Sequence, residues 1–344
     1  MRKLDAITDP VYHSKTPGRV ERFFLRYIRD PRDLPFAFLC LQIALTVVPL
    51  GISLFFTEGT AWAVLALAFL SSQVYFLGPF TLMLHNTSHN PFFKREYTWG
   101  NRLIPWGLCP VMGQSPDTYF SHHIGMHHAE NNMELDGSST LRFQRDSLID
   151  FMRYYGRFLI FGIFDLFRYL RLRNKNSFLR KAAVGEATFL AVSLLLLWVD
   201  WKSSLVVFLG PLILVRFLMM SGNWAQHAFI DPARPENNFV NSITCINTVY
   251  NRRCFNDGYH IGHHLKPHLH WTEMPRDFQA NVDKYVENRA LVFEGADYHK
   301  IWAMLMLKRY DVLADHLVNL NGMYRSKEEA MNLLKERTRR YQQG

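Results

Sequence analysis

The feature of this sequence that most restricts its fold is a set of four long apolar runs separated by strongly charged segments. The hydrocarbon core of a bilayer is about 30 Å thick, and about 20 residues of helix are needed to cross it. Each run reaches or approaches that length, which predicts an all-α membrane protein with four transmembrane helices. The predicted spans cover about residues 34–56, 60–84, 182–199 and 204–220.

The lengths of the intervening segments predict how these helices are paired. Residues 57–59 separate the first two spans and residues 200–203 the last two, so we expect two helical hairpins. Lys and Arg gather before the first and third spans and after the second and fourth, whereas the two turns contain only Lys202. Basic loops stay on the cytoplasmic side. Both termini and both large polar segments are therefore predicted to be cytoplasmic, as a helical cap on a multi-pass protein of the endoplasmic reticulum or a bacterial inner membrane.

This organisation predicts three regions along the chain. Residues 1–33 form a cytoplasmic N-terminal segment without the pattern of a signal peptide, residues 34–275 a membrane domain, and residues 276–344 a cytoplasmic helical tail. Residues 147–170 are apolar but interrupted by charges, and we expect amphipathic helices at the membrane surface. A fifth span is the alternative for this segment, which the charges disfavour. They are Asp150, Arg153, Arg157, Asp165 and Arg168.

The net charge of +9 raises the question of a nucleic-acid partner. The sequence contains no RNP motif, no zinc-finger spacing and no basic patch interleaved with aromatic residues, so we expect no nucleic acid to bind. The basic excess instead marks the cytoplasmic side and attracts anionic lipid headgroups. The cysteines form no CxxC pair and are predicted to be free thiols in a reducing compartment. They are Cys40, Cys109, Cys245 and Cys254.

Histidines gather in three clusters with the spacing of metal ligands, within residues 85–89, 122–128 and 260–264, and His227 is a fourth, single candidate. On a helix, residues three or four apart share a face. The second histidine of each adjacent pair is rotated by about 100° and can serve another ion. Nine imidazoles exceed the needs of one ion and predict a dinuclear centre. They are His85, His89, His123, His127, His128, His227, His260, His263 and His264.

The positions of the nine histidines support a shared site, because all of them fall at the predicted boundary between membrane and cytoplasm. Imidazole suits zinc, copper, iron and nickel. No thiol accompanies the clusters, which disfavours structural zinc. A histidine-rich pair of metals beside lipid favours iron and oxygen chemistry, although the ligand set alone leaves zinc and copper open.

Several other residues are predicted to act beside the ligands. A metal-bound histidine commonly donates its second N–H to a carboxylate or carbonyl, and Asp257, Glu130 and Glu134 are placed for this. His122 is expected next to the ligands rather than among them. Asn223 lies one turn before His227 and is expected to hold a metal-bound water.

Arg216 stands inside the fourth apolar run, and two interpretations of it are open. It could bind the carboxylate of an acyl substrate or a phosphate of coenzyme A. Alternatively, it could be an arginine whose side chain extends to the membrane interface.

The motifs HNTSH at 85–89, HIGMHH at 123–128 and HIGHH at 260–264 resemble the three histidine boxes of the membrane fatty-acid desaturase and hydroxylase superfamily. Their order around two helical hairpins is also similar, and the resemblance covers about residues 34–275. Asn223 and His227 are similar to the Asn-x-x-x-His element of stearoyl-CoA desaturases. The resemblance implies two non-haem irons, O2 as co-substrate, and two electrons from an outside donor.

The activity implied by this resemblance is an acyl-lipid desaturase that introduces a C=C bond. A lipid or carotenoid hydroxylase and an alkene-forming fatty-acid decarboxylase would need the same iron site and stay open. A zinc-dependent membrane hydrolase and a catalytically silent lipid-binding protein are more remote alternatives. The sequence contains no cytochrome b5 module, ferredoxin cysteine pattern or Rossmann glycine motif. We therefore expect a separate donor of the cytochrome b5 or ferredoxin type.

Overall fold

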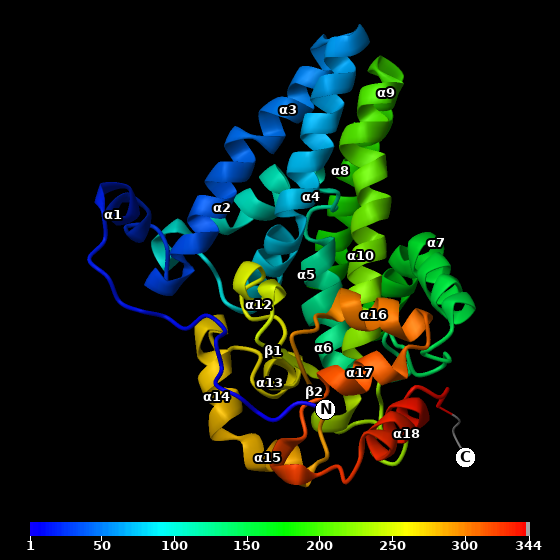
Figure 1. The fold of residues 1–344 in the computed structure, drawn as a ribbon. Helices are drawn as coiled ribbons and strands as arrows, with labels where there is room; N and C mark the ends of the chain where they lie inside the picture. Colours follow the sequence, from blue (N-terminus) through cyan, green and yellow to red (C-terminus); the bar gives the residue numbers. More distant parts are fainter. Residues whose placement is uncertain (342–344) are drawn as a thin grey trace. The chain divides into compact units, whose positions relative to one another are not determined.

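A computed structural model describes residues 1–341 of the chain, and its helices and strands are labelled in Figure 1. The chain divides into two compact units. Unit 1 comprises Met1–Tyr12, Met126–Leu166 and Phe217–Gly344, and unit 2 comprises His13–Gly125 and Phe167–Arg216. Both are mostly helical, as the sequence predicts.

Unit 2 contains the first three of the predicted spans and the beginning of the fourth. Its α-helices are α1 (Arg19–Leu25), α2 (Leu34–Leu45), α3 (Val47–Ser53), α4 (Gly59–His89), α5 (Thr118–His122), α8 (Asn176–Val199) and α9 (Trp201–Ser204). Short 3-10 helices cover Pro31–Asp33, Leu54–Phe56, Arg95–Arg102 and Pro110–Met112, and π-helical turns cover Ile104–Leu108 and Leu205–Leu209. Two further α-helices cross the division between the units, α7 (Leu148–Leu172) and α10 (Gly210–Gln226), as does the π-helical turn His123–His127.

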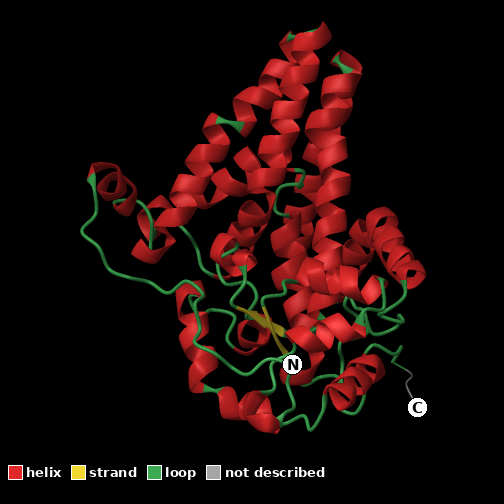
Figure 2. Cartoon of the chain, viewed as in Figure 1, coloured by secondary structure: helices red, strands yellow, loops and turns green. Residues whose placement is uncertain are grey.

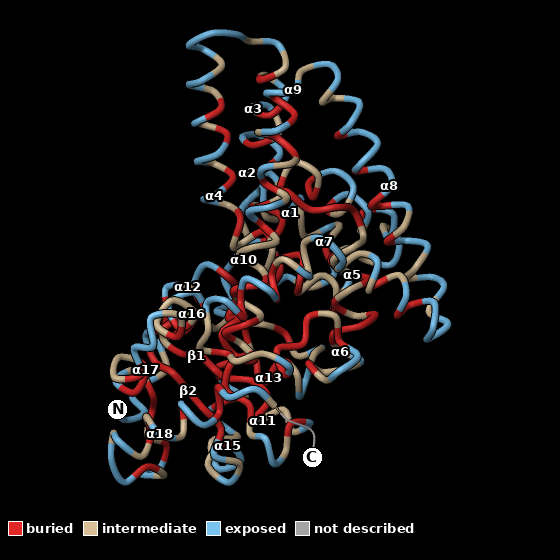
Figure 3. Tube along the Cα trace, turned by 90° about the vertical axis from the view of Figure 1, so that its right-hand side faces the viewer, coloured by how far each residue is buried: buried red, intermediate tan, exposed pale blue. Residues whose placement is uncertain are grey.

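Within residues 1–341, four helical segments are long and apolar enough to cross a membrane, which confirms the predicted number. They are Pro31–Phe56, Gly59–His89, Asn176–Val199 and Trp201–Gln226. Large apolar side chains remain exposed along α4 and α8, where Figure 3 shows much of the trace in pale blue. Such faces are stable in contact with lipid, since water would impose the full cost of hydrating them.

All four segments extend beyond the predicted limits, and two of the extensions reach residues of the predicted site. The second continues beyond residue 84 to His89, so His85 and His89 lie in its last turns. The fourth continues to Gln226 and therefore includes Asn223. The sequence-based limits were drawn where the apolar run ends. The helices continue into polar residues because their backbone hydrogen bonds do not depend on the polarity of the side chains.

Unit 1 holds the rest of the chain. Its α-helices are α6 (His128–Glu130), α11 (Asn238–Asn241), α12 (Val249–Arg253), α13 (His260–Leu265), α14 (Met274–Ala280), α15 (Val282–Glu287), α16 (Tyr298–Met306), α17 (Tyr310–His316) and α18 (Lys327–Arg337). Short 3-10 helices cover Trp271–Glu273 and Leu320–Gly322. In Figure 2 the yellow strands are β1 (Thr244–Ile246) and β2 (Val292–Glu294), which pair in parallel with Cys245 opposite Phe293.

The two strands lie in the core of unit 1 and position the histidine motif that follows β1. Cys245, Ile246 and Phe293 are fully buried. The N-terminal segment also packs here, since the carboxylate of Asp9 accepts a hydrogen bond from the Tyr259 hydroxyl at 2.7 Å. Tyr259 directly precedes α13. Its hydrogen bond to Asp9 therefore ties the start of this helix to the N-terminal segment.

The segment predicted to be amphipathic, residues 147–170, is one continuous helix, α7. It is not among the four candidate spans of residues 1–341, and its position at the membrane surface stays a prediction. Phe151 and Tyr154 on α7 are buried within unit 1, whereas Phe161 and Phe164 are exposed.

Candidate metal centre

Unit 1 brings together four of the nine predicted ligands, and we refer to His127, His227, His260 and His264 as the four-histidine cluster. Each offers one ring nitrogen, and these atoms all lie within 4.8 Å of one another. His127 ends the turn that follows α5, His227 directly follows α10, and the other two lie on α13. No cysteine or carboxylate belongs to the cluster in the described part of the chain.

The ring nitrogens in the cluster are spaced as the ligands of one ion would be. Nε2 of His260 lies 3.2 Å from Nε2 of His227 and 3.0 Å from Nε2 of His264. A metal–imidazole bond of about 2.1 Å with ordinary bond angles would place two ligand nitrogens about 3.0–3.4 Å apart. Both measured distances fall in this range, so the donor set fits a metal.

Hydrogen bonds fix the tautomers of two of the four rings. Nδ1 of His227 lies 2.9 Å from the backbone carbonyl oxygen of Asn241, and Nδ1 of His127 lies 2.6 Å from Oδ2 of Asp136. A carbonyl oxygen and a carboxylate can only accept, so both Nδ1 atoms donate. Each neutral ring therefore keeps its lone pair on Nε2, where a metal would bind.

The Asp136 carboxylate is itself held in place. It accepts hydrogen bonds from the backbone N–H of Ser138 at 2.8 Å, the Ser138 hydroxyl at 2.6 Å and the backbone N–H of Asn132 at 3.2 Å. Asn132 also donates from Nδ2 to Oδ1 of Asn241 at 3.0 Å. The supports of His127 and His227 are thus joined in one buried network.

Burial keeps His227 and His264 uncharged at neutral pH. Burial, followed by the neighbouring His127, lowers the pKa of His227 to about 4. Burial and the surrounding histidines also lower the pKa of His264 well below its usual value. Neutral imidazole is the form that binds metals.

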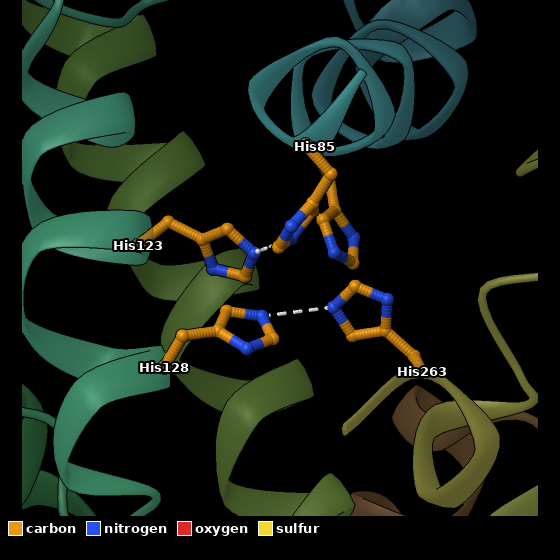
Figure 4. A group of neighbouring side chains, drawn as sticks. His85, His123, His128 and His263 are labelled. Carbon is orange, nitrogen blue, oxygen red and sulfur yellow. Dashed lines mark hydrogen bonds between the residues drawn. The ribbon is translucent and has the colours of Figure 1, made fainter. Parts of the chain in front are cut away.

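A second histidine pair lies in unit 1. Nε2 of His128, on α6, lies 2.9 Å from Nε2 of His263, on α13, and Figure 4 shows both rings facing each other. Because His263 and His264 are consecutive on α13, their side chains leave the helix in different directions. The adjacent histidines thus have different neighbours, and their binding of different ions stays a prediction.

Unit 2 holds the remaining three predicted ligands. His85 and His89 lie four residues apart on α4, and His123 follows α5. Nε2 of His89 lies 2.9 Å from Nε2 of His123, and the rings of His85 and His123 are 4.5 Å apart between centroids (Figure 4). Tyr119 stacks on His123 at 5.2 Å and restrains its ring.

One pairing expected from spacing differs from the structure. Their spacing of four residues would put His123 and His127 on one face of an α-helix, but His123 lies with the histidines of α4 and His127 belongs to the four-histidine cluster. The turn His123–His127 is π-helical. Its hydrogen bonds join residues five apart, so the α-helical i, i+4 rule does not apply there.

The neighbourhood of Asn223 is more specific than the sequence could indicate. Its Nδ2 donates to the backbone carbonyl oxygen of Ser138 at 2.9 Å and to the hydroxyl oxygen of Tyr154 at 2.7 Å. Asn223 therefore binds the same short segment, residues 136–138, that supports His127.

The predicted accessory acids lie in different surroundings. Asp257 is buried and accepts from the Tyr250 hydroxyl at 2.7 Å and from Nε2 of Gln226 at 3.4 Å. Glu130 is half-buried at the end of α6, and Glu134 is exposed. His122 ends α5 and is half-buried.

Arg216 faces a carboxylate that sequence reasoning did not single out. Its Nη2 lies 3.6 Å from Oε1 of Glu186 on α8, and Glu186 is buried. Neither interpretation made from the sequence included this ion pair.

Sequence reasoning also missed Asp136 and Asn241. Asp136 follows His127 by nine residues, within a run of polar residues that could all have been loop positions. Asn241 supports His227 through its backbone carbonyl, which carries no signal in the sequence. The indication in the sequence that this loop is ordered is that Asp136 is followed by Gly137 and two serines.

A sequence model of a protein family, described as fatty acid desaturase, matches residues 60–296 of the chain. No curated protein and no solved structure matched the chain. The matched region contains all nine predicted ligands, together with Asp136, Asn223 and Asn241.

Proposed function

The chain belongs to the fatty acid desaturase family, and from this membership we propose that it is an O2-dependent membrane oxidoreductase that introduces a C=C bond into a fatty-acyl chain. The observation that carries the proposal is the four-histidine cluster, in which hydrogen bonds to Asp136 and Asn241 direct the Nε2 lone pairs of His127 and His227 toward the other rings.

We propose two irons as the metals. The nine predicted ligands together would serve the two ions, and His127, His227, His260 and His264 would hold one of them. Imidazole binds iron well, and the family membership favours iron over the zinc and copper that the same ligands could hold. Bound at these histidines, iron would supply the activation of O2 that removal of hydrogen from an unactivated methylene requires.

The residues around the cluster would keep its ligands ready for the metal. Asp136 and Asn241 hold the rings of His127 and His227 in the metal-binding tautomer and orientation. The burial of the cluster also limits the access of water, which protects a reactive site from side reactions. Asn223 would orient a water or hydroxide at the metal, with Asp257, Glu130 and His122 nearby.

The remaining parts of the proposal concern the surroundings of the enzyme. Both termini and both large polar segments would face the cytoplasm, with the four spans arranged as two hairpins, because Lys and Arg flank the spans on one side. The electrons would come from a separate protein of the cytochrome b5 or ferredoxin type. The substrate would be a lipid or fatty-acyl chain, taken from the membrane.

Product analysis tests the reaction. The chain would be expressed in a host of known lipid profile, and the lipids analysed by mass spectrometry. We expect products that have lost two hydrogen atoms relative to a host lipid. Products that have instead gained one oxygen atom would replace desaturation by hydroxylation, and a terminal alkene with loss of the carboxyl carbon would indicate decarboxylation.

Metal analysis tests the site independently. We expect about two irons per purified chain, since nine imidazoles exceed what one ion can bind. His264→Ala should lower the iron content and abolish turnover. His316→Ala is the matched control, because His316 bonds to the Glu294 carbonyl oxygen and to Lys300 away from the cluster. One zinc per chain would favour a hydrolase, and full iron in His264→Ala would overturn the ligand assignment.

A further inference from the structure

Unit 2 contains an ion pair between two helices that belong to candidate membrane spans. Glu186 lies on α8 and Arg216 on α10, and Nη2 of the arginine is 3.6 Å from Oε1 of the glutamate. Both residues fall within candidate membrane spans. Ionisable residues in such spans are costly, and they commonly mark a pathway or a binding site.

A polar loop, residues 113–116, packs against both of the helices that carry this pair. A Cβ atom on Gly185 would lie 1.8 Å from the carbonyl oxygen of Pro116, and one on Gly113 would lie 2.6 Å from the carbonyl oxygen of Pro211. The backbone of residues 113–116 therefore touches α8 directly before Glu186 and touches α10 at Pro211, five residues before Arg216. Ser115 lies between these two contacts.

Two polar atoms at this place are buried and have no hydrogen-bond partner within residues 1–341. They are Oγ of Ser115 and Oε1 of Glu186, and the two residues are only 4% and 7% exposed. The 3.6 Å separation from Arg216 is too long for a hydrogen bond. Buried polar atoms nearly always have partners. Glu186, Arg216 and Ser115 can therefore form hydrogen bonds to a further group that binds at this place.

The depth of Glu186 in its membrane span suits the polar end of a lipid. Glu186 follows Lys181, the last basic residue of α8, by five residues, which is about 7.5 Å along a helix. A lipid whose polar end lies at this depth has its chain among the apolar faces of the spans.

We propose that Ser115, Glu186 and Arg216 form a subsite that binds an uncharged, hydrogen-bonding end group of a long-chain lipid, with a hydroxyl as the best match. The proposal names the substrate class of the enzyme, and in this respect it rests on the proposed function. A hydroxyl can donate to Oε1 of Glu186 and accept from Ser115 or Arg216.

The charge balance excludes the more obvious ligand, a fatty-acid carboxylate. Arg216 alone would attract an anion, but Glu186 already neutralises it, and a second carboxylate beside Glu186 would be repelled in a medium of low dielectric. The subsite therefore selects for hydrogen-bonding groups without charge. Removal of the charge on Glu186 should reverse this preference.

The test is a binding measurement with two probes of equal chain length, radiolabelled 1-hexadecanol and hexadecanoic acid. The purified metal-loaded protein would be embedded in lipid nanodiscs and kept without reductant, so that no turnover is needed. We expect the wild type to bind the alcohol at least about tenfold more tightly than the acid, which corresponds to about 1.4 kcal/mol. Ser115→Ala should weaken alcohol binding several-fold and leave acid binding unchanged.

Glu186→Gln is the decisive variant, because it is nearly isosteric but leaves Arg216 without a counter-charge. We expect its affinity for the acid to rise about tenfold, the effect of one charged hydrogen bond. Glu58→Gln is the matched control, since Glu58 is an exposed carboxylate of the same unit, and it should change neither affinity. An unchanged ratio of alcohol to acid binding in Glu186→Gln would overturn the subsite, and so would binding of neither probe, as expected if water alone occupies the site.

A double variant distinguishes an effect of charge on acid binding from an effect of misfolding. Glu186→Gln combined with Arg216→Gln removes both charges, so we expect the acid affinity to return to the wild-type level. If Glu186→Gln alone fails to fold, alcohol binding is measured in the double variant and in Ser115→Ala instead. Alcohol affinities equal to that of the wild type in both variants would overturn the proposal. A shift of preference without any desaturated product would refute the proposed reaction and leave the subsite standing.

Discussion

Nδ1 of His127 lies 2.6 Å from Oδ2 of Asp136, and both side chains are buried. A carboxylate at this distance holds the ring through a short, charge-assisted hydrogen bond and makes its other nitrogen a better metal ligand. Asp136 is fixed in turn by Ser138 and Asn132. The orientation of this ligand is therefore set before any metal binds.

Replacement of Asp136 by alanine should consequently weaken metal binding more than it disturbs the fold. We expect metal affinity to fall about 10- to 100-fold, the range for loss of a residue that supports a ligand. A competition titration with a chelator measures this change. Glu134→Ala is the matched control, because Glu134 is an exposed acid two residues earlier. Equal affinities of the two variants would refute the supporting role of Asp136.

The sequence was sufficient for features that depend on local pattern. Apolar runs of spanning length predict the four long helices, because crossing a bilayer requires length and apolar character alone. Spacing within α4 and α13 predicts that His85 and His89, or His260 and His264, share a face, and these pairs lie close together.

Features that depend on contacts between distant segments were beyond the sequence. Asn241 supports His227 through a backbone carbonyl, and any residue type could have provided that group. Likewise, Glu186 meets Arg216 only because α8 and α10 are adjacent in the fold. The π-helical turn before His128 changes the face on which each histidine lies, and no composition rule predicts such a turn.

Arg145 should be the most important structural residue of unit 1 outside the cluster. It is 1% exposed and donates to the carbonyl oxygens of Thr140, Leu141, Phe143, Ala228, Arg337 and Arg339. Burial lowers its pKa to about 9, so it remains charged at neutral pH. It thereby joins the residue after His227 to the C-terminal segment.

Arg145→Met would leave several buried carbonyl groups without donors, and each costs about 1–3 kcal/mol. We expect the free energy of unfolding to fall by at least about 3 kcal/mol in a denaturant titration of the detergent-solubilised protein. Arg142→Met is the control, because Arg142 is exposed, and it should change stability by no more than about 0.5 kcal/mol. Similar stabilities of the two variants would show that the C-terminal segment is not anchored by Arg145.

The topology can be tested with single cysteines. Glu58 lies between the first two candidate spans, and Arg325 is an exposed residue of the C-terminal region. Because Lys and Arg flank the other ends of the spans, Glu58→Cys and Arg325→Cys should be labelled from opposite sides of sealed vesicles by a membrane-impermeant thiol reagent. The four native cysteines would first be replaced. Labelling of both positions from one side would contradict the proposed orientation. Gly344, at the predicted cytoplasmic C-terminus, lies outside the described residues.

Asn223 connects the end of α10 to the segment that supports His127. Its Nδ2 bonds to the Ser138 carbonyl oxygen and to the Tyr154 hydroxyl, and the Ser138 hydroxyl lies 3.4 Å from Nδ1 of His127. These bonds fix the amide, which would let its oxygen hold a water at the metal.

Asn223→Leu keeps the size of the side chain but removes all its hydrogen bonds. We expect this variant to retain most of its iron and to lose at least about tenfold of its activity, the lower end of effects for residues that support a metal site. Tyr154→Phe is the matched control, because it removes one partner of the amide and leaves Asn223 in place. Iron content and turnover measured on the same preparations decide the role. Near-normal activity in Asn223→Leu would exclude water positioning, and iron loss as severe as in His227→Leu would instead make Asn223 a direct ligand.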